Sequence, residues 1–159
     1  MIDERRHPLK IAVISDTHVE SLGGIPTPIL MKLEEVDLIV HAGDFTEGAV
    51  LEELRTLAEV KAVYGNMDSS ELKRMLPSKE LFTVNGKRIG LIHGSGGHWG
   101  IAERIRPMFD DVDIIIYGHS HKPYSKVIRG SLLFNPGPAR NYYGLLTIEE
   151  GVKAEIVRV

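Results

Sequence analysis

Six apolar runs in this chain each end in a short polar cluster, usually with a glycine beside it. The runs are rich in branched residues and have the length of buried strands. The clusters that follow them are Asp16-Thr17-His18, Gly43-Asp44, Gly65-Asn66-Met67-Asp68, His93-Gly94, Gly118-His119-Ser120-His121 and Asn135-Pro136-Gly137. In an α/β sheet the carboxyl ends of the strands form one rim, where ligands bind. We therefore expect these side chains to converge on one site.

The rest of the pattern predicts one α/β domain over residues 1–159. Strands are expected at 9–15, 36–42, 60–64 and 112–117, and helices at 29–35, 47–59, 69–76 and 100–111, the last interrupted at Pro107. Hairpins are expected over 80–93, 126–134 and 143–159, turning at Asn85-Gly86, Gly130 and Glu150-Gly151. Parallel β-α-β units followed by hairpins require a second sheet.

Composition narrows the chemistry. The chain has no cysteine, which excludes disulfides, thiolate metal ligands and cysteine nucleophiles. Its net charge of −3 and lack of a basic run argue against binding of duplex nucleic acid. No apolar stretch reaches the roughly 20 residues of a membrane-spanning helix. The charged segment 1–8 lacks the apolar core of a signal peptide, so we expect a cytoplasmic protein.

The converging side chains suit two metal ions better than one. The set has four imidazoles, two carboxylates and one amide: His18, His93, His119, His121, Asp16, Asp44 and Asn66. One ion commonly takes about four to six ligands, so two ions sharing a carboxylate would use them all. Mixed nitrogen and oxygen ligands suit Mn, Fe, Zn, Co or Ni. Such a pair is best suited to hydrolysing a phosphate ester.

In order along the chain, these motifs resemble those of the calcineurin-like metallophosphoesterases. The motifs are Asp16-x-His18, Gly43-Asp44, Gly65-Asn66-x-Asp68, His93 and Gly118-His119-x-His121, and the resemblance covers about residues 9 to 159. The chain's size and its Asn135-Pro136-Gly137 segment are similar to the small bacterial and archaeal phosphodiesterase branch. The resemblance implies a four-layer α/β/β/α sandwich, in which helices flank two mixed sheets.

The resemblance also implies a ligand set and a reaction. One metal would be held by Asp16, His18, Asp44 and His121, and the other by Asp44, Asn66, His93 and His119. Asp44 would bridge two divalent transition-metal ions, with manganese expected first. A metal-bridging hydroxide would attack the phosphorus of a small phosphodiester, and Asn66 would contact the substrate and stabilise the developing charge.

One position departs from the family pattern. Many members have a histidine after the Gly-Asn pair, where it protonates the leaving oxygen or steadies the transition state. This chain has Met67, whose thioether cannot donate a proton. General acid catalysis contributes typically 10²–10⁴-fold, so substrates with poor leaving groups are expected to react slowly. His98, in the following "GSGGHWG" loop, is a candidate donor or substrate contact.

Other readings stay open at this point. A phosphomonoesterase would share the mechanism, and a scaffold similar to the retromer subunit of this fold would bind protein partners instead. Small members of such folds commonly self-associate, so a homo-oligomer is also expected. The segment from His93 to Gly100 is not a dinucleotide fingerprint, because Trp99 stands where the third glycine should be.

Three predictions concern the remaining histidines and the segment near Arg140. His41 precedes the rim and is expected to be a core residue, whereas His7 is expected to be solvated. Arg140, Tyr142 and Tyr143 are expected to be exposed, where they would contact substrate or pack at a subunit interface.

Overall fold

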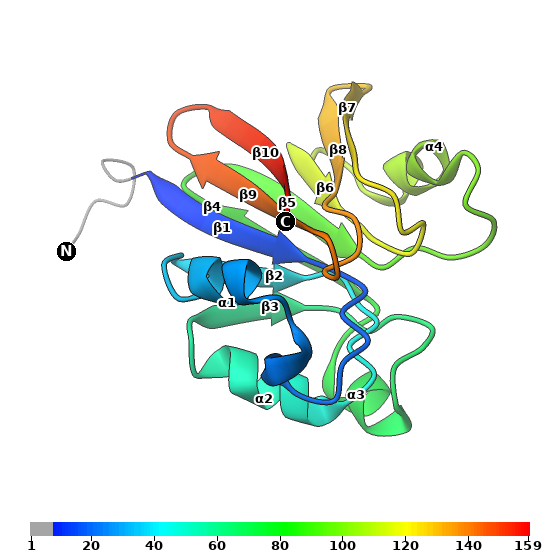
Figure 1. The fold of residues 1–159 in the computed structure, drawn as a ribbon. Helices are drawn as coiled ribbons and strands as arrows, with labels where there is room; N and C mark the ends of the chain where they lie inside the picture. Colours follow the sequence, from blue (N-terminus) through cyan, green and yellow to red (C-terminus); the bar gives the residue numbers. More distant parts are fainter. Residues whose placement is uncertain (1–7) are drawn as a thin grey trace.

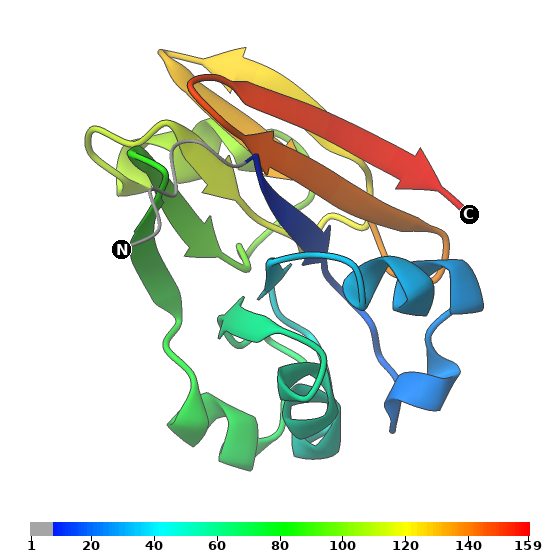
Figure 2. The same cartoon turned by 90° about the vertical axis from the view of Figure 1, so that its left-hand side faces the viewer.

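The computed structural model describes residues 8–159, which form two five-stranded mixed sheets (Figures 1 and 2). The first sheet has the order β10-β9-β1-β2-β3, from β1 (Leu9–Ile14), β2 (Leu38–His41), β3 (Glu59–Ala62), β9 (Tyr142–Ile148) and β10 (Val152–Arg158). The second has the order β4-β5-β6-β8-β7, from β4 (Lys79–Val84), β5 (Lys87–Ile92), β6 (Ile114–Ile116), β7 (Tyr124–Ile128) and β8 (Ser131–Asn135). The prediction that His7 is solvated concerns a residue outside the described range.

Helices cover the outer face of each sheet. Helices α1 (Thr27–Leu33), α2 (Gly48–Arg55) and α3 (Ser70–Met75) pack on the first sheet, with the short 3-10 turn η2 (Leu22–Gly24) before them. Helix α4 (Ile101–Ile105), which continues into η3 (Arg106–Met108), packs on the second sheet. The sandwich therefore has the four layers and the two mixed sheets that the sequence predicted.

Strand β1 shows how the sequence builds this arrangement. Its side chains alternate between faces, as a strand requires. Ala12 and Ile14 belong to the core beneath the helices, and Ile11 and Val13 belong to the core between the sheets. All four are fully buried. A strand covered on both faces must be apolar at every position, which explains the unbroken run "IAVI".

The three predicted hairpins are present, and two of their turns have the positive φ angles of a two-residue hairpin turn. Asn85 and Gly86 both have positive φ, of 47° and 81°, as do Arg129 and Gly130. Positive φ at both central residues is what a two-residue hairpin turn of the primed type requires. Glu149 donates its N–H to the Gly151 carbonyl at the third turn.

Three of the four predicted helices are shorter in the structure, and the one expected over 29–35 is instead shifted to Thr27–Leu33. The helix expected over 47–59 ends at Arg55, and Thr56 caps it with backbone bonds to Glu53 and Leu54. The helix expected over 100–111 is α4 alone, because Pro107 stands in the following 3-10 turn. Proline has no N–H to continue an α-helical ladder. Within residues 8–159, no helix has both the length and the apolar character needed to cross a membrane.

Candidate metal centre

The two sheets bring the predicted ligands to one rim of the sandwich. Asp16 and His18 follow β1, Asp44 follows β2, and Asn66 follows β3 in the first sheet. His93 follows β5, and His119 and His121 follow β6 in the second. Figure 1 shows β1, β2 and β3 ending on the same side of their sheet, where the connecting loops gather. The site therefore lies where the carboxyl ends of both sheets meet.

Two groups of ligand-type atoms lie close enough to hold an ion. Asp16, His18 and His121 form one group, and Asp16, Asp44 and His93 form the other, with the atoms of each group within 4.8 Å of one another. His93 Nε2 lies 3.2 Å from Asp44 Oδ2, and His121 Nε2 lies 3.4 Å from Asp16 Oδ1. The groups share Asp16, so the two candidate positions are adjacent.

Both aspartates stand between histidines of the two groups. Asp44 Oδ2 is 3.2 Å from His93 Nε2 and 3.9 Å from His18 Nε2. Asp16 Oδ1 is 3.4 Å from His121 Nε2 and 3.9 Å from His93 Nε2. The geometry therefore allows Asp44 to serve both positions, as the sequence predicted, and gives Asp16 a similar central place that the sequence did not indicate.

Three buried atoms of this cluster have no hydrogen-bond partner: Asp16 Oδ1, His18 Nε2 and His93 Nε2. A buried polar atom left unpaired is costly, and natural proteins rarely tolerate one. Three such atoms directed into one cluster fit a site completed by a cation. Imidazole nitrogens and carboxylate oxygens without sulfur suit a divalent transition-metal ion.

The backbone at the site is strained. Five of the predicted ligands have φ between 48° and 69°, in the left-handed region: Asp16, His18, Asp44, His119 and His121. Residues with a side chain rarely adopt this conformation, and such strain clusters at functional sites. A left-handed residue turns the chain abruptly at the strand end, so that its side chain remains at the rim. The sequence did not predict this feature at residues other than glycine.

Neighbouring groups hold the aspartates in place. Asp44 Oδ1 accepts a hydrogen bond from the Met67 N–H at 2.8 Å, which leaves Oδ2 facing the histidines. Asp68, buried itself, accepts from the N–H groups of Asp44 and Gly65 at 3.0 and 2.8 Å. It therefore joins the turns after β2 and β3. Asp68 stands in the Gly65-Asn66-x-Asp68 motif, but its position in the sequence does not indicate this role.

Two histidines are oriented by backbone carbonyls. His93 Nδ1 donates to the Ala42 carbonyl at 2.7 Å, which leaves Nε2 for a ligand. His119 Nε2 donates to the Gly96 carbonyl at 2.8 Å, which leaves Nδ1. Metal-binding histidines usually make such a bond through the other ring nitrogen, because it fixes the tautomer and the ring orientation.

The charges of the cluster are coupled. Burial alone would lower the pKa of His93, but the nearby carboxylates of Asp44 and Asp16 outweigh burial and raise it. Burial would likewise raise the pKa of Asp44, but His93, the Met67 N–H and His18 together outweigh burial and lower it. Without a metal, the carboxylates thus favour a proton on His93 in the place where a cation would bind.

Close packing around the aspartates explains two of the glycines. A Cβ at Gly65 would lie 2.1 Å from Asp44 Oδ1, and one at Gly118 would lie 2.0 Å from Ser15 Oγ. Ser15 Oγ in turn donates to Asp16 Oδ2 at 2.8 Å. Only glycine therefore allows the turns after β3 and β6 to approach the aspartates this closely.

A family model described as the calcineurin-like phosphoesterase superfamily domain matches residues 9–151. The chain belongs to this family. It is 38% identical over 130 residues to a probable metallophosphoesterase of Methanothermobacter thermautotrophicus, covering 80% of this chain and 75% of the relative. It is 28% identical over 168 residues to the phosphodiesterase MJ0936 of Methanocaldococcus jannaschii, covering 94% and 99%.

Among solved structures, Vps29 of Entamoeba histolytica in complex with Zn²⁺ matches with a TM-score of 0.71 and 28% identity, covering 94% of this chain and 99% of that one. These comparisons confirm the family and the fold that the motifs implied. Membership of this family supports a phosphoester hydrolase, and the candidate centre supplies side chains that could hold divalent metal.

Three further predicted site residues, His119, His98 and Asn66, lie at the edge of the candidate centre. The ring of His119 is 5.3 Å from that of His93, and the ring of His98 is 5.1 Å from His119 and 6.0 Å from His121. The structure thus brings His98 beside the predicted ligands. The Asn66 side chain is exposed, next to Met67, whose backbone binds Asp44. The exposed side chains of Asn66 and His98 are therefore accessible to a substrate.

His41 is a core residue, as predicted. It is fully buried, and its ring stacks on Phe45 at 3.5 Å. The Gly43 N–H donates to Nδ1, so Nε2 carries the proton and faces Thr17 Oγ1 at 3.1 Å. Burial lowers the pKa of His41 to about 3. The ring remains neutral and supports the turns beneath the site.

The prediction that Tyr143 is exposed was wrong. Tyr143 is buried and belongs to the core beneath the helices, because β9 begins at Tyr142 and its next residue faces inward. Arg140 is exposed, as predicted, and lines a hollow of about 200 Å³ next to His18. Arg140 is therefore available to a substrate on that side of the site.

Proposed function

We propose that this chain is a dinuclear metal-dependent phosphodiesterase. The observation that carries the proposal is the pair of overlapping ligand groups that share Asp16, with Asp44 Oδ2 between His18 and His93. The seven ligands would be Asp16, His18, Asp44, Asn66, His93, His119 and His121. Two ions, manganese first among the candidates, would use this whole set. The substrate would be a small phosphodiester.

Divalent ions bound here would supply the Lewis acidity that activates water and offsets charge on the phosphate. The chain's own residues position the reactants. The exposed amide of Asn66 donates a hydrogen bond to a phosphate oxygen and stabilises the charge that grows there. His98, beside the rings of His119 and His121, is placed to contact the substrate or give a proton to the leaving oxygen.

A direct test uses bis-p-nitrophenyl phosphate with the metal-stripped protein, with and without Mn²⁺, Zn²⁺, Co²⁺ or Ni²⁺. The p-nitrophenyl monoester is run beside it. We expect turnover that depends on metal and prefers the diester. A preference for the monoester would make the chain a phosphomonoesterase. Absence of turnover with every metal, despite bound ions, would contradict the proposal.

Protein binding is the second candidate function. The chain is as similar in sequence to Vps29, a vacuolar protein sorting protein, as to the phosphodiesterase MJ0936, at 28% identity in each case. A scaffold has no need for ligand-type side chains at all seven positions, and this chain keeps them. The hydrolysis experiment decides between the two, because a scaffold would bind metal without turning over either ester.

A further inference from the structure

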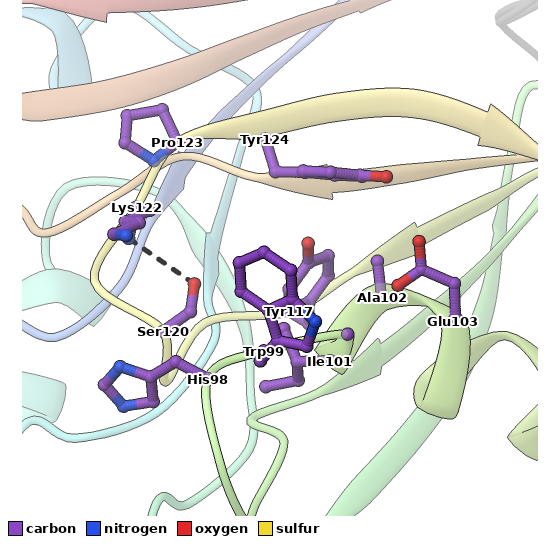
Figure 3. A pocket seen from close by; sticks show the side chains of 11 residues that line it. His98, Trp99, Ile101, Ala102, Glu103, Tyr117, Ser120, Lys122, Pro123 and Tyr124 are labelled. Atoms are coloured by element: carbon purple, nitrogen blue, oxygen red, sulfur yellow. Dashed lines mark hydrogen bonds between the residues drawn. The ribbon is translucent and has the colours of Figure 1, made fainter.

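A pocket of about 460 Å³ opens beside the candidate metal centre (Figure 3). His98 lines it at the edge nearest the centre, since its ring lies 5.1 Å from that of His119. Ser120, which stands between two predicted ligands in the sequence, lines it as well. A group bound in the pocket would therefore lie next to the candidate metal centre.

The wall of this pocket includes an unusual aromatic residue. Trp99 is the only tryptophan of the chain, and 94% of it is exposed. Large apolar side chains are normally covered, and an uncovered ring in a concave site commonly indicates binding. Tyr117 and Tyr124 line the same pocket, with ring centroids 6.3 Å apart. Tyr117 is buried, at 1% exposed, and Tyr124 is half-buried, so Trp99 provides most of the aromatic surface open to a ligand.

The loop that carries Trp99 is held in place. Arg104 of α4 donates to three of its backbone carbonyls, those of Ser95, Gly97 and Trp99. The Gly96 carbonyl accepts a hydrogen bond from His119. The loop is therefore tied to a helix on one side and to a predicted metal ligand on the other. Trp99 is exposed on a fixed support.

Polar groups stand at the rim of the aromatic surface. Glu103, exposed on α4, offers a carboxylate acceptor, and Lys122 offers an ammonium donor across the pocket. The Lys122 N–H is bonded to Ser120 Oγ, which ties this segment to the metal rim. A purely apolar ring would leave these groups unused. A heteroaromatic ring with both donors and acceptors on its edge would pair with them.

We propose that this pocket binds the nucleoside part of the phosphoester substrate, with the base stacked on Trp99 and the phosphate at the metal centre. This inference rests on the proposed phosphoesterase function and adds the class of substrate. A pocket of this volume lies in the usual range for small ligands. Stacking on an aromatic side chain tolerates any base, so the pocket would select for a nucleotide without strong preference among bases.

The single tryptophan gives a readout that does not depend on turnover. Metal-stripped and Zn²⁺-loaded protein are titrated with adenosine 5′-monophosphate and, separately, with ribose 5-phosphate, which lacks only the base. Fluorescence is excited at the red edge of the tryptophan band, where the base does not absorb. We expect the nucleotide to quench saturably, with a midpoint about 10-fold lower than that of ribose 5-phosphate. Equal midpoints, or no quenching, would overturn the proposal.

Variants then locate the binding. Both ligands compete with hydrolysis of bis-p-nitrophenyl phosphate, and Trp99→Ala should raise the inhibition constant of the nucleotide about 10-fold. Trp99→Phe, which keeps a ring, should raise it less, and the constant for ribose 5-phosphate should stay the same in both. Met31→Ala, on the remote helix α1 at a residue 59% exposed, is the control. A nucleotide constant unaffected by Trp99→Ala would refute the assignment.

The two proposals fail in different ways. Metal-dependent hydrolysis without any effect of the base would refute the nucleoside pocket and leave the phosphodiesterase intact. Quenching by the nucleotide without hydrolysis of any ester would refute the enzyme. Tyr124→Leu retains Trp99 and should weaken quenching by the nucleotide, and Tyr124→Phe should preserve it. This pair keeps the pocket testable by fluorescence if Trp99→Ala fails to fold.

Discussion

At the scale of single residues, Asp44 has the most demanding position. One carboxylate oxygen is held by the Met67 N–H and the other faces His93 and His18. Asp44→Asn keeps the shape and the bond from Met67 but loses the charge. We expect at least a 100-fold loss of metal-dependent hydrolysis and depletion of both ions, measured by elemental analysis of the purified protein.

His121→Ala is the companion variant, because His121 belongs to only one of the two ligand groups. Its side chain is 51% exposed, so its removal should leave the fold intact. We expect loss of about one metal ion per chain, with the other retained. If Asp44→Asn kept both ions and most of the activity, Asp44 would not be the shared ligand.

His41 predicts a pH dependence of stability. Its pKa is about 3 in the fold and near 6.5 in the unfolded chain. Between these pH values the unfolded chain binds a proton that the folded chain does not. The contribution of His41 to the free energy of unfolding is therefore complete above about pH 6.5 and is lost as the pH falls toward about 3. The loss is on the order of 4 kcal/mol.

Urea unfolding of the metal-stripped protein measures this dependence. The free energy of unfolding is determined from about pH 7 to about pH 4 for the natural chain and for His41→Asn, which cannot titrate. The stability advantage of the natural chain over the variant should shrink as the pH decreases. An advantage that stayed constant would show that His41 does not titrate differently on unfolding.

Candidate ligands could be identified from the sequence where a metal-binding side chain directly follows a predicted strand. The seven ligand candidates followed from polar residues at strand ends, and the structure brings Asp16, Asp44, His18, His93 and His121 into the two ligand groups. The role of Asp68 was not predictable, because its bonds join two turns that are distant in the sequence. In the sequence, Trp99 only ruled out a dinucleotide fingerprint. Its solvent exposure depends on the folding of the loop and could not be predicted from the sequence.

At the scale of elements, the turns after the strands determine how closely the side chains of the candidate site approach one another. The turn after β3 touches Asp44 so closely that a Cβ at Gly65 would lie 2.7 Å from the Asp44 nitrogen. Gly65→Ala must push the two turns apart. We expect a destabilisation of about 1–3 kcal/mol and at least a 10-fold loss of metal affinity, measured by urea unfolding and metal titration.

Gly151→Ala is the matched control for this substitution. A Cβ at Gly151, in the turn between β9 and β10, has no atom within 4 Å. Its effect on stability should stay within about 0.5 kcal/mol, with metal affinity unchanged. Equal effects of the two substitutions would mean that contact with Asp44 does not explain Gly65.

Elements were predictable to the extent that their signals are local. The hairpin at Asn85-Gly86 depends on two neighbouring residues and was located correctly. The end of α2 depends on how far the helix covers the sheet, which a local pattern does not contain. The same limit applies to Tyr143, which looked exposed beside Arg140 and is buried in the core between the first sheet and its helices.

At the scale of the whole molecule, the two sheets are joined by a tight contact. Phe134 of β8 is fully buried between them, and a Cβ at Gly144 of β9 would lie 2.4 Å from its ring. Phe134→Ala should cost about 3–5 kcal/mol, because the cavity lies between two rigid sheets. Val127→Ala, at an exposed residue of the same second sheet, should cost less than about 0.5 kcal/mol in the same urea experiment.

Both sheets also carry predicted ligands, so metal bound to them would connect the two halves of the sandwich. Metal at about 100 times its dissociation constant stabilises a fold by roughly 2.7 kcal/mol. For a chain of this length, a chelator should therefore lower the melting temperature by on the order of 5–10 °C. Asp44→Asn should melt at the same temperature with and without chelator. An unchanged melting temperature of the natural chain would contradict a site shared between the sheets.

The left-handed backbone at Asp16, His18, Asp44, His119 and His121 has a consequence for descent. A use for each of these side chains would offset the cost of the unfavourable conformation. A descendant released from hydrolysis would gain stability by taking glycine or asparagine there, because those residues adopt the conformation more easily. Drift toward glycine at these positions would thus record when a lineage of this fold ceased to be an enzyme.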